Sequence, residues 1–437
     1  MRSPSAWLFA KEWRELLASR AWWVMLGVMG PLVGMSFISA VTAYGELSGV
    51  NGGAAGVGEA FSPLVGIWAP TFSASELAAA FLLPFVAIRL VSADKQSGAL
   101  TIEMQHALTA SRRLAIKAAV LMAAWSAATA APLAGVGLWA LYGGHIDLPE
   151  LAVVVAGHVL NGALTIALAC AAAAMADHPA TAAIVTLAVT VGTWLINFAA
   201  AINGGWWDRA AAFTPTAMVG EFQRGLLRAD VVLAAVLLTV AGLAIATLWL
   251  RPGDQPVLRL RRSLMVLSVV VVGLLVASTV SPSWDASESR RNSFSDATVA
   301  TLRGIQGALR VEAHFAPEDP RRADLERNAF RKLRRALPNA RIEYVSATST
   351  GLFEQAADKY GEIWYYLNGA SARSRITTPE GVVESVMSLA RVEAPAESAD
   401  DVFRGYPLAV RPRGAALVFY LAWPLAVAVL AFVQWRT

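Results

Sequence analysis

Eight hydrophobic runs, each close to or above the length that crosses a bilayer, constrain this chain more than any other feature. They cover residues 21–43, 76–92, 116–142, 151–174, 180–202, 231–250, 264–280 and 415–435. A helix needs about 20 apolar residues to cross the hydrocarbon layer. Only 16% of the residues are charged, whereas soluble domains carry about 25%. The sequence therefore predicts an α-helical polytopic membrane protein with eight spans.

Basic residues flank these runs on one side of the membrane. Segments 2–20, 95–117 and 251–262 carry four Lys or Arg residues each, and the loop at 143–150 carries none. Cytoplasmic loops are enriched in Lys and Arg, so we expect both chain ends in the cytoplasm and residues 285–412 outside it. Heavy use of Ala and Arg is typical of a GC-rich bacterial genome, which predicts the bacterial inner membrane. Because the basic residues border spans, they indicate orientation in the lipid bilayer and do not predict nucleic-acid binding.

The segment before the first span, within residues 1–20, has the pattern of an amphipathic helix. At 100° per residue Phe9 and Trp13 fall on one arc, and the charged residues fall on the opposite arc. Such a helix lies in the membrane interface. Two interpretations stay open: an anchor that sets topology, or a helix that also contacts a cytoplasmic partner.

The loop between the second and third runs is short, charged and expected in the cytoplasm. Lys95, Arg112, Arg113 and Lys117 stand there against Asp94 and Glu103. A short structured loop of this kind is a place where a soluble partner can push on a membrane protein. Elsewhere the chain contains no Gly-x-x-x-x-Gly-Lys-Ser/Thr sequence, so it lacks the loop that cradles ATP phosphates.

Polar residues inside the spans form two candidate stripes. His158 and Asn161 share a helical face in the fourth span, as do Thr190 and Asn197 in the fifth. Such residues form either hydrogen bonds between packed helices or the lining of a substrate route. The lone Cys170 excludes an intramolecular disulfide and a cysteine-based metal site. No metalloprotease or serine-hydrolase motif is present, so we expect neither a catalytic site nor a metal.

Residues 285–392 are expected to form a small α/β domain. The pattern predicts strands at 311–315, 341–345 and 362–367, a possible fourth at 373–377, and helices at 320–337, 353–359 and 380–390. This alternation favours partly parallel strands. Arg321, Arg322, Arg331 and Arg335 lie on the first of these helices; they form either a solvated basic face or a site for an anionic partner. Residues 393–413 read as a loose charged linker.

Residues 1–250 resemble the permeases of ABC-2-type transporters. The residues that carry the resemblance are Lys11-Glu12-Trp13-Arg14-Glu15, Asp94-Lys95-Gln96-Ser97-Gly98-Ala99-Leu100, Thr109-Ala110-Ser111-Arg112-Arg113 with Lys117, and Phe213-Thr214-Pro215 with Phe222-Gln223-Arg224-Gly225. The resemblance implies a six-span permease domain over 21–250. It further implies an ATPase-coupling loop containing Asp94, Lys95, Gly98, Leu100, Arg112, Arg113 and Lys117, and a preceding helix containing Lys11, Glu12, Trp13 and Arg14.

The remainder, about 264–437, resembles the extracytoplasmic component of gliding-motility (Gld-type) ABC transporters, shortened and fused to the permease. On this resemblance, 251–263 is a basic cytoplasmic linker, and the seventh and eighth spans flank the outer domain. The implied function is the permease subunit of an exporter, not itself an enzyme and without its own cofactor. A separate ABC ATPase would bind ATP and magnesium, a second permease copy would complete the transporter, and an envelope partner would bind the outer domain. Two alternatives remain: a membrane-anchored scaffold or sensor, and a secondary transporter.

Overall fold

The computed structural model describes residues 4–51, 62–98, 108–203, 206–251, 253–280, 282–288, 290–316, 319–337, 339–345, 359–395, 403 and 405–436. The chain divides into two compact units. The first comprises residues 1–196, 211–284 and 405–437, and the second comprises residues 197–210 and 285–404. The second unit therefore includes a segment, 197–210, that the sequence analysis assigned to the permease domain.

Within the described residues, eight helices are long and apolar enough to cross a membrane, which confirms the predicted polytopic helical class. The spans run over Arg20–Gly49, Leu64–Gln96, Ala110–Leu141, Leu148–Met175, Pro179–Ile202, Ala229–Leu250, Pro256–Ala277 and Ala415–Arg436. The predicted second span was too short, since its helix extends by a turn or more at both ends. The predicted linker at 251–263 was also wrong in part, because the seventh span begins at Pro256 and its first turns carry the basic residues.

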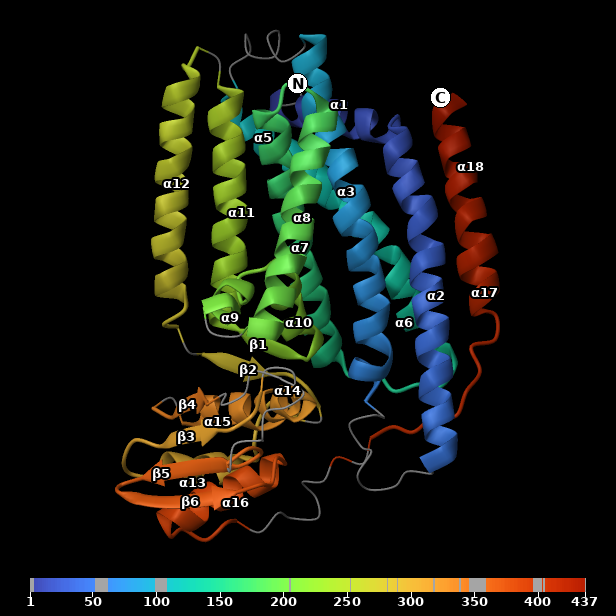
Figure 1. Ribbon diagram of the computed structural model, residues 1–437. Helices are drawn as coiled ribbons and strands as arrows, with labels where there is room; N and C mark the ends of the chain where they lie inside the picture. The colour runs from blue at the N-terminus through green and yellow to red at the C-terminus, as the bar shows by residue number, and fades with distance from the viewer. Residues whose placement is uncertain are drawn as a thin grey trace, which may run out of the picture. The chain divides into compact units, whose positions relative to one another are not determined.

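The helices that lie wholly or mainly in the first unit are, in order, α1 (Pro4–Leu17), α2 (Arg20–Asn51), α3 (Ala69–Ser97), α5 (Ala110–Ala128), α6 (Ala130–Leu141), α7 (Leu148–Met175), α8 (Pro179–Asn203), α10 (Pro215–Gln223), α11 (Ala229–Leu250), α12 (Pro256–Ala277), α17 (Ala415–Leu417) and α18 (Trp423–Arg436). The π-helical turns Leu64–Trp68 and Val418–Ala422 precede α3 and α18. Figure 1 shows the long helices side by side, with α3 and α7 near the middle, α12 at one edge, and α2 beside α18 at the other edge.

The third span is interrupted at Thr129, between α5 and α6. Pro132 lies in the first turn of α6 and has no backbone N–H to donate to the preceding turn. At the interruption the Thr129 hydroxyl donates to the carbonyl of Ser126 at 2.6 Å. The sequence analysis treated 116–142 as one continuous span, and this proline is the signal for the break.

The last span packs along α2 through glycines. A Cβ atom built on Gly30 would lie 2.2 Å from Trp423, and one on Gly34 would lie 2.3 Å from Phe419. The Trp423 indole N–H also donates to the carbonyl of Leu26 at 2.7 Å. Small residues that let two membrane helices approach closely are a general means of packing where no hydrophobic force operates between them. The eighth span is therefore part of the helical bundle.

The segment 405–413, predicted as a loose linker, is held against the end of α2, which corrects that prediction. The Tyr44 hydroxyl donates to the carbonyl of Tyr406 at 2.8 Å, and the Leu408 N–H donates to the Ser48 hydroxyl at 2.9 Å. The ring of Tyr406 stacks on His145 with centroids 3.7 Å apart. These bonds satisfy backbone groups that an extended segment would otherwise leave unpaired.

The second unit contains a four-stranded sheet of order β4-β3-β5-β6. Its strands are β3 (Arg310–Ala313), β4 (Arg341–Tyr344), β5 (Ile363–Leu367) and β6 (Ala370–Ser374). β3 pairs in parallel with β4 and antiparallel with β5, and β5 pairs antiparallel with β6. The prediction of partly parallel strands is confirmed. Alternate residues of β5 are buried in the core of this unit.

Helices α13 (Asp296–Arg303), α14 (Pro320–Leu325), α15 (Arg331–Ala336) and α16 (Pro379–Ala390) supply the rest of this core, and α9 (Trp206–Ala211) precedes α10 along the chain. A π-helical turn, Glu326–Phe330, joins α14 to α15, so the helix predicted over 320–337 is continuous. The helix predicted at 353–359 lies outside the described residues except for Lys359, which is in a turn.

The fourth strand begins three residues earlier than predicted. Asn368 and Gly369 both have positive φ, 50° and 82°, and they connect β5 to β6 as a two-residue hairpin. An Asn-Gly pair is the strongest short-range signal for this turn, because both positions require a left-handed backbone. The sequence analysis did not use this signal, and it placed the strand at 373–377.

Candidate functional site

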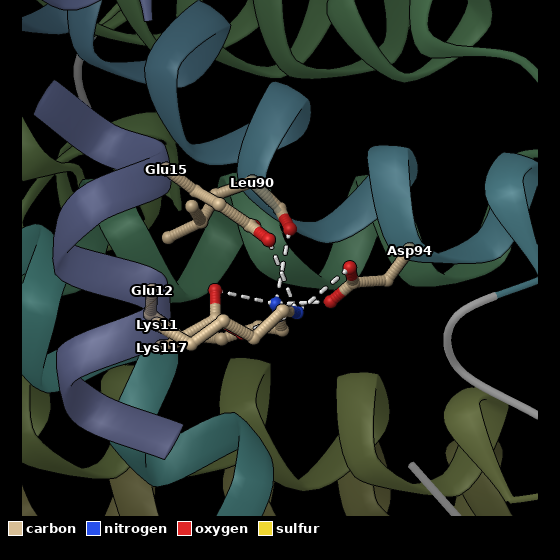
Figure 2. A network of polar contacts seen from close by, with 6 residues as sticks. All are labelled: Lys11, Glu12, Glu15, Leu90, Asp94 and Lys117. Carbon is tan, nitrogen blue, oxygen red and sulfur yellow. Dashed lines mark hydrogen bonds and ion pairs between the residues drawn. The ribbon is translucent and has the colours of Figure 1, made fainter. Parts of the chain in front are cut away.

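The ammonium group of Lys117 is the centre of a buried charge cluster that joins three helices (Figure 2). It donates to Glu12 of α1 at 2.7 Å, to Asp94 of α3 at 2.5 Å and to the carbonyl of Leu90 at 3.1 Å. An ammonium group has three N–H donors, so each donor of Lys117 has an acceptor. The side chains of Lys117, Asp94 and Glu12 are 4%, 5% and 0% exposed. We call these residues, with Lys11 and Glu15, the inner charge cluster.

Lys11 is the second cation of the inner charge cluster and lies at its rim. Its ammonium group is 3.2 Å from Asp94, 3.4 Å from Glu12 and 3.3 Å from Glu15. Its side chain is 22% exposed and that of Glu15 is 41% exposed. The cluster therefore grades from a dry centre at Lys117 to a partly hydrated edge, and α1 contributes charges to both.

The local sequence explains how an acidic residue becomes buried in α1. Leu8, Glu12 and Leu16 are four residues apart, and all three are buried. Residues at this spacing lie on one helix face. Phe9 is 40% exposed. Glu12, which the sequence analysis placed on the charged arc, thus faces the bundle between two leucines. Pairing with Lys117 is what makes this burial tolerable.

The electrostatics of the cluster favour keeping it intact. Burial raises the pKa of Glu12 above its ordinary value, although the nearby Lys117 and Lys11 act in the opposite direction. A buried carboxylate that loses its cation is costly, since its desolvation is no longer compensated. Separating α1 from α3 and α5 would expose or orphan these charges, so the cluster holds the three helices together.

A second polar contact joins the C-terminal ends of α3 and α7. The ammonium group of Lys95 donates to the carbonyl of Ala174 at 3.0 Å and to that of Ala176 at 2.7 Å. The last carbonyls of a helix have no intrahelical partner and carry partial negative charge. Lys95, which follows Asp94 in the sequence, therefore caps the C-terminal end of α7. α3 is thus bound to α7 through Lys95 as well as to α1 and α5 through the cluster.

The predicted coupling residues fall into different environments. Gly98 ends α3 with a φ of 74°, and Leu100 lies outside the described residues. Arg112 is exposed at the start of α5, whereas Arg113 and Lys117 are buried. The role of these residues in coupling to a partner stays a prediction. Asp94, Arg113 and Lys117 face inward because they lie on the buried sides of α3 and α5.

The remaining residues of the N-terminal helix lie away from the dry centre. Trp13 is half-buried and stacks on Phe9 with ring centroids 6.4 Å apart. Arg14 is exposed. Of the four residues that the sequence analysis selected in this helix, Lys11 and Glu12 are the two that reach α3 and α5.

The two polar stripes differ in their contacts. In α7, His158 is buried beside the ring of Phe72, and its Nε2 lies 3.3 Å from the amide nitrogen of Gln223 in α10. Asn161, one turn further on, is half-buried. His158 thus makes a contact between helices, as the first of the two interpretations predicts.

In α8 the threonine hydroxyls bond to their own helix. Thr190 donates to the carbonyl of Thr186 at 3.0 Å, and Thr193 donates to that of Thr190 at 2.7 Å. Asn197 is half-buried near the end of this helix. Most apolar side chains of α8 are exposed, and its span is only 11% buried. The described hydroxyl bonds of α8 therefore do not contribute to a polar route shared with α7.

The basic helix of the second unit is largely neutralised or covered by neighbours. Arg321 bonds to Asp319 at 2.7 Å, and its guanidinium lies over Phe315 and Tyr360. Arg322 lies 4.2 Å from the centroid of the Tyr344 ring. Cation–π contacts of this kind stabilise a domain. This surface therefore has structural partners within the unit.

The other two predicted arginines of this face belong to α15. Arg335 donates to the carbonyl of Arg331 at 3.4 Å, and the neighbouring Arg334 pairs with Glu326, which also accepts from Tyr344. Arg334 and Tyr344 hold the pKa of Glu326 below its ordinary value against the effect of burial. The arrangement favours the first interpretation, a basic face whose charges are balanced within the domain.

The pH dependence of the Asp319 interactions tests whether the charges of this basic face are neutralised within the domain. The hydrogen bonds from Arg321 and Tyr360 lower the pKa of Asp319 to about 2 from its ordinary 3.8. Because the folded pKa is lower than the unfolded one, the stabilisation is complete above the unfolded pKa and is lost as pH falls through the folded value. We expect Asp319→Asn to destabilise the second unit by about 1 kcal/mol at pH 7, since the half-exposed Arg321 is screened by solvent, and to have little effect near pH 2. Amide hydrogen exchange of residues 310–345 in the full chain measures both; equal effects at the two pH values would contradict the prediction.

Sequence reasoning missed the partners within the inner charge cluster, although a signal was present. Lys117 lies inside the run that begins at Ile116. An ionisable residue inside a span is expensive and needs a partner. This rule predicts an acidic partner for Lys117. The sequence contains three candidates, Glu12, Asp94 and Glu103, and does not show which of them is the partner. Gln223 was quoted for the family resemblance, and its contacts with Ser73 and His158 were not anticipated.

No protein-family model, curated protein or solved structure matches this chain. Among the described residues, no group of three or more His, Cys, Asp or Glu side chains is placed to hold a metal ion. In the part of the chain that the structure describes, the inner charge cluster is the best-defined candidate site.

Proposed function

We propose that this chain is the membrane permease subunit of an ATP-driven transporter of the ABC-2 type, moved by a separate ATPase. The observation that supports the proposal is the inner charge cluster. It joins α1 to the last turns of α3 and the first turns of α5, which are the two ends of the loop at 98–109. A partner that pushes on this loop would act on three helices at once.

The force would be carried as a rigid-body movement. Lys117 binds one carboxylate from α1 and one from α3, and breaking a buried pair of this kind costs roughly 3–5 kcal/mol. Lys95 adds the inner end of α7. Helices held in this way move together, and packed bundles change between discrete arrangements. The coupling loop therefore has a mechanical connection to four helices.

ATP binding is assigned to a partner chain. The sequence has no phosphate-cradling loop, so the ATP and magnesium would lie on the ATPase. A second copy of the permease, or a related chain, would complete the transporter.

With eight spans, both chain ends would lie on one side of the membrane. The positive charge of segments 2–20 and 95–117 favours the cytoplasm for that side. The domain between the seventh and eighth spans would then face outside, where an envelope partner can bind it, and the transporter would act as an exporter in the bacterial inner membrane.

Charge reversal at Arg112 tests the docking of the ATPase. Arg112 is exposed at the start of α5, so Arg112→Glu should leave the fold intact while repelling an acidic docking groove. We expect the affinity for the ATPase and the stimulation of its activity to fall about tenfold or more, because like charges brought together at an interface cost several kcal/mol. Copurification with the ATPase and its hydrolysis rate in nanodiscs provide the two measurements.

The matched control is Arg436→Glu, the same charge reversal at an exposed arginine at the end of α18. It should leave both measurements unchanged. Full binding and stimulation with Arg112→Glu would overturn the proposed docking. A chain that functions in cells lacking the ATPase would favour the scaffold or secondary transporter instead.

A further inference from the structure

The segment from α10 to the start of α11 is bonded to two spans at their outer ends. The amide nitrogen of Gln223 donates to the Ser73 hydroxyl of α3 at 2.9 Å and lies 3.3 Å from His158 of α7. Phe222 packs directly on Gly157, where an added Cβ would lie 2.3 Å from it. α3 and α7 are thus joined at one end through Lys95 and at the other through Gln223. Any change in the spacing of these two helices would strain this segment.

The same segment leads into a short β-ribbon. β1 (Leu226–Arg228) pairs with β2 (Ser283–Asp285), and the Ala229 N–H donates to the carbonyl of Pro282 at 3.0 Å. Arg228 pairs with Asp230 at 2.6 Å and with Glu221 at 3.5 Å. These ion pairs hold the end of α10, β1 and the start of α11 in one arrangement. The ribbon therefore moves with α10.

β2 ends at Asp285, where the longer segment of the second unit begins. The Asp285 carboxylate accepts hydrogen bonds from the N–H and hydroxyl of Ser287, from the N–H and side-chain amide of Asn292, and from the hydroxyl of Ser293. A carboxylate that accepts this many bonds fixes the loop around it. Arg290, in the same loop, pairs with Asp296 at the start of α13. The Asp285 carboxylate therefore orders the loop that follows the ribbon.

From these contacts we infer that α10 and the β1–β2 ribbon form an output linkage, through which movement of α3 reaches Asp285 and the loop that its carboxylate holds. α3 carries Asp94 of the inner charge cluster near one end and Ser73 near the other. The linkage continues through Gln223, the ribbon and the Asp285 carboxylate. The inner charge cluster thereby controls how firmly the loop at 286–295 is ordered. This control does not depend on what the protein transports. This inference rests on the proposed function for the source of the movement, but the coupling itself exists without nucleotide.

A contiguous set of contacts demonstrates coupling only when a perturbation at one end is felt at the other. The test is a double-mutant cycle on the full chain in nanodiscs, without ATPase or nucleotide. Lys117→Met perturbs the cluster, and Gln223→Leu cuts the linkage. Hydrogen exchange of the peptide that covers residues 282–295 is the measurement. Asn292 and Ser287 donate their backbone N–H groups to Asp285 there. Thr42→Val is the control, because Thr42 is exposed and its hydroxyl bonds only to Ile38 of its own helix in the described contacts.

We expect Lys117→Met to change the exchange rate of this peptide at least about fivefold, the lower end of usual coupling between sites. In the Gln223→Leu background the same substitution should have no further effect, and Thr42→Val should have none in either background. If Lys117→Met does not fold, Asp94→Asn takes its place. Unchanged exchange at 282–295 despite increased exchange in α1 would overturn the inference, as would an effect that survives Gln223→Leu. Because no ATPase is present, these outcomes are separate from those of the Arg112 experiment.

Discussion

Replacing Lys117 by methionine is expected to destabilise the helical bundle by about 3–5 kcal/mol, the usual cost of removing one partner of a buried ion pair. Methionine fills a similar volume, so the loss is one of charge. The carboxylates of Glu12 and Asp94 would both remain buried and would both lose the ammonium group that they share. Unfolding of the full chain in mixed detergent micelles, followed by circular dichroism, measures the change.

Two comparisons separate the charge from the packing. Lys11→Met removes the rim cation, whose side chain is 22% exposed; it should cost about 1 kcal/mol or less, because solvent screens the loss. The triple variant Glu12→Gln, Asp94→Asn, Lys117→Met removes all three buried charges together. It should recover most of the stability, since replacing an entire buried ion pair is often nearly neutral. A triple variant as unstable as Lys117→Met would show that the cluster acts through packing.

Gly34→Val is expected to separate the last span from α2 and to destabilise the bundle by about 1–3 kcal/mol, as overpacking of a close contact does. The new Cβ would lie 2.3 Å from the Cβ of Phe419 and 2.6 Å from its ring. Neither position is the flexible end of a side chain, so a helix must move. The measurement is again unfolding in mixed micelles, combined with proteolysis of the segment before α17.

Gly27→Val is the matched control. It places the same side chain on the same helix, two turns away, where no atom lies within 4 Å of the added Cβ. The two variants share any loss or gain of helix propensity, so their difference reports the contact with Phe419. Equal stability of the two would refute the conclusion that the eighth span is packed on α2 through glycines.

Some features of the inner charge cluster were predictable and others were not. The sequence placed Lys11, Glu12, Asp94 and Lys117 among the candidate residues through the motifs that carry the family resemblance. It did not predict that Glu12 is buried. Helical periodicity assigned Glu12 to the polar arc, because it considers only the polarity of each residue. It contains no information about the residues of other helices that pack against that face. Burial of Glu12 depends on Lys117, which is 105 residues away in sequence.

The sequence by itself determined the class of this protein: eight hydrophobic runs of membrane length, and a charged region with the alternation of a small α/β domain. These follow from local properties, the length of apolar segments and the period of side chains along a helix or strand. Only the tertiary structure decided which helices the charges join, that the last span packs on α2, and that 405–413 is bound rather than loose. Those outcomes depend on contacts between residues far apart in the chain, and a single sequence contains no measure of distance.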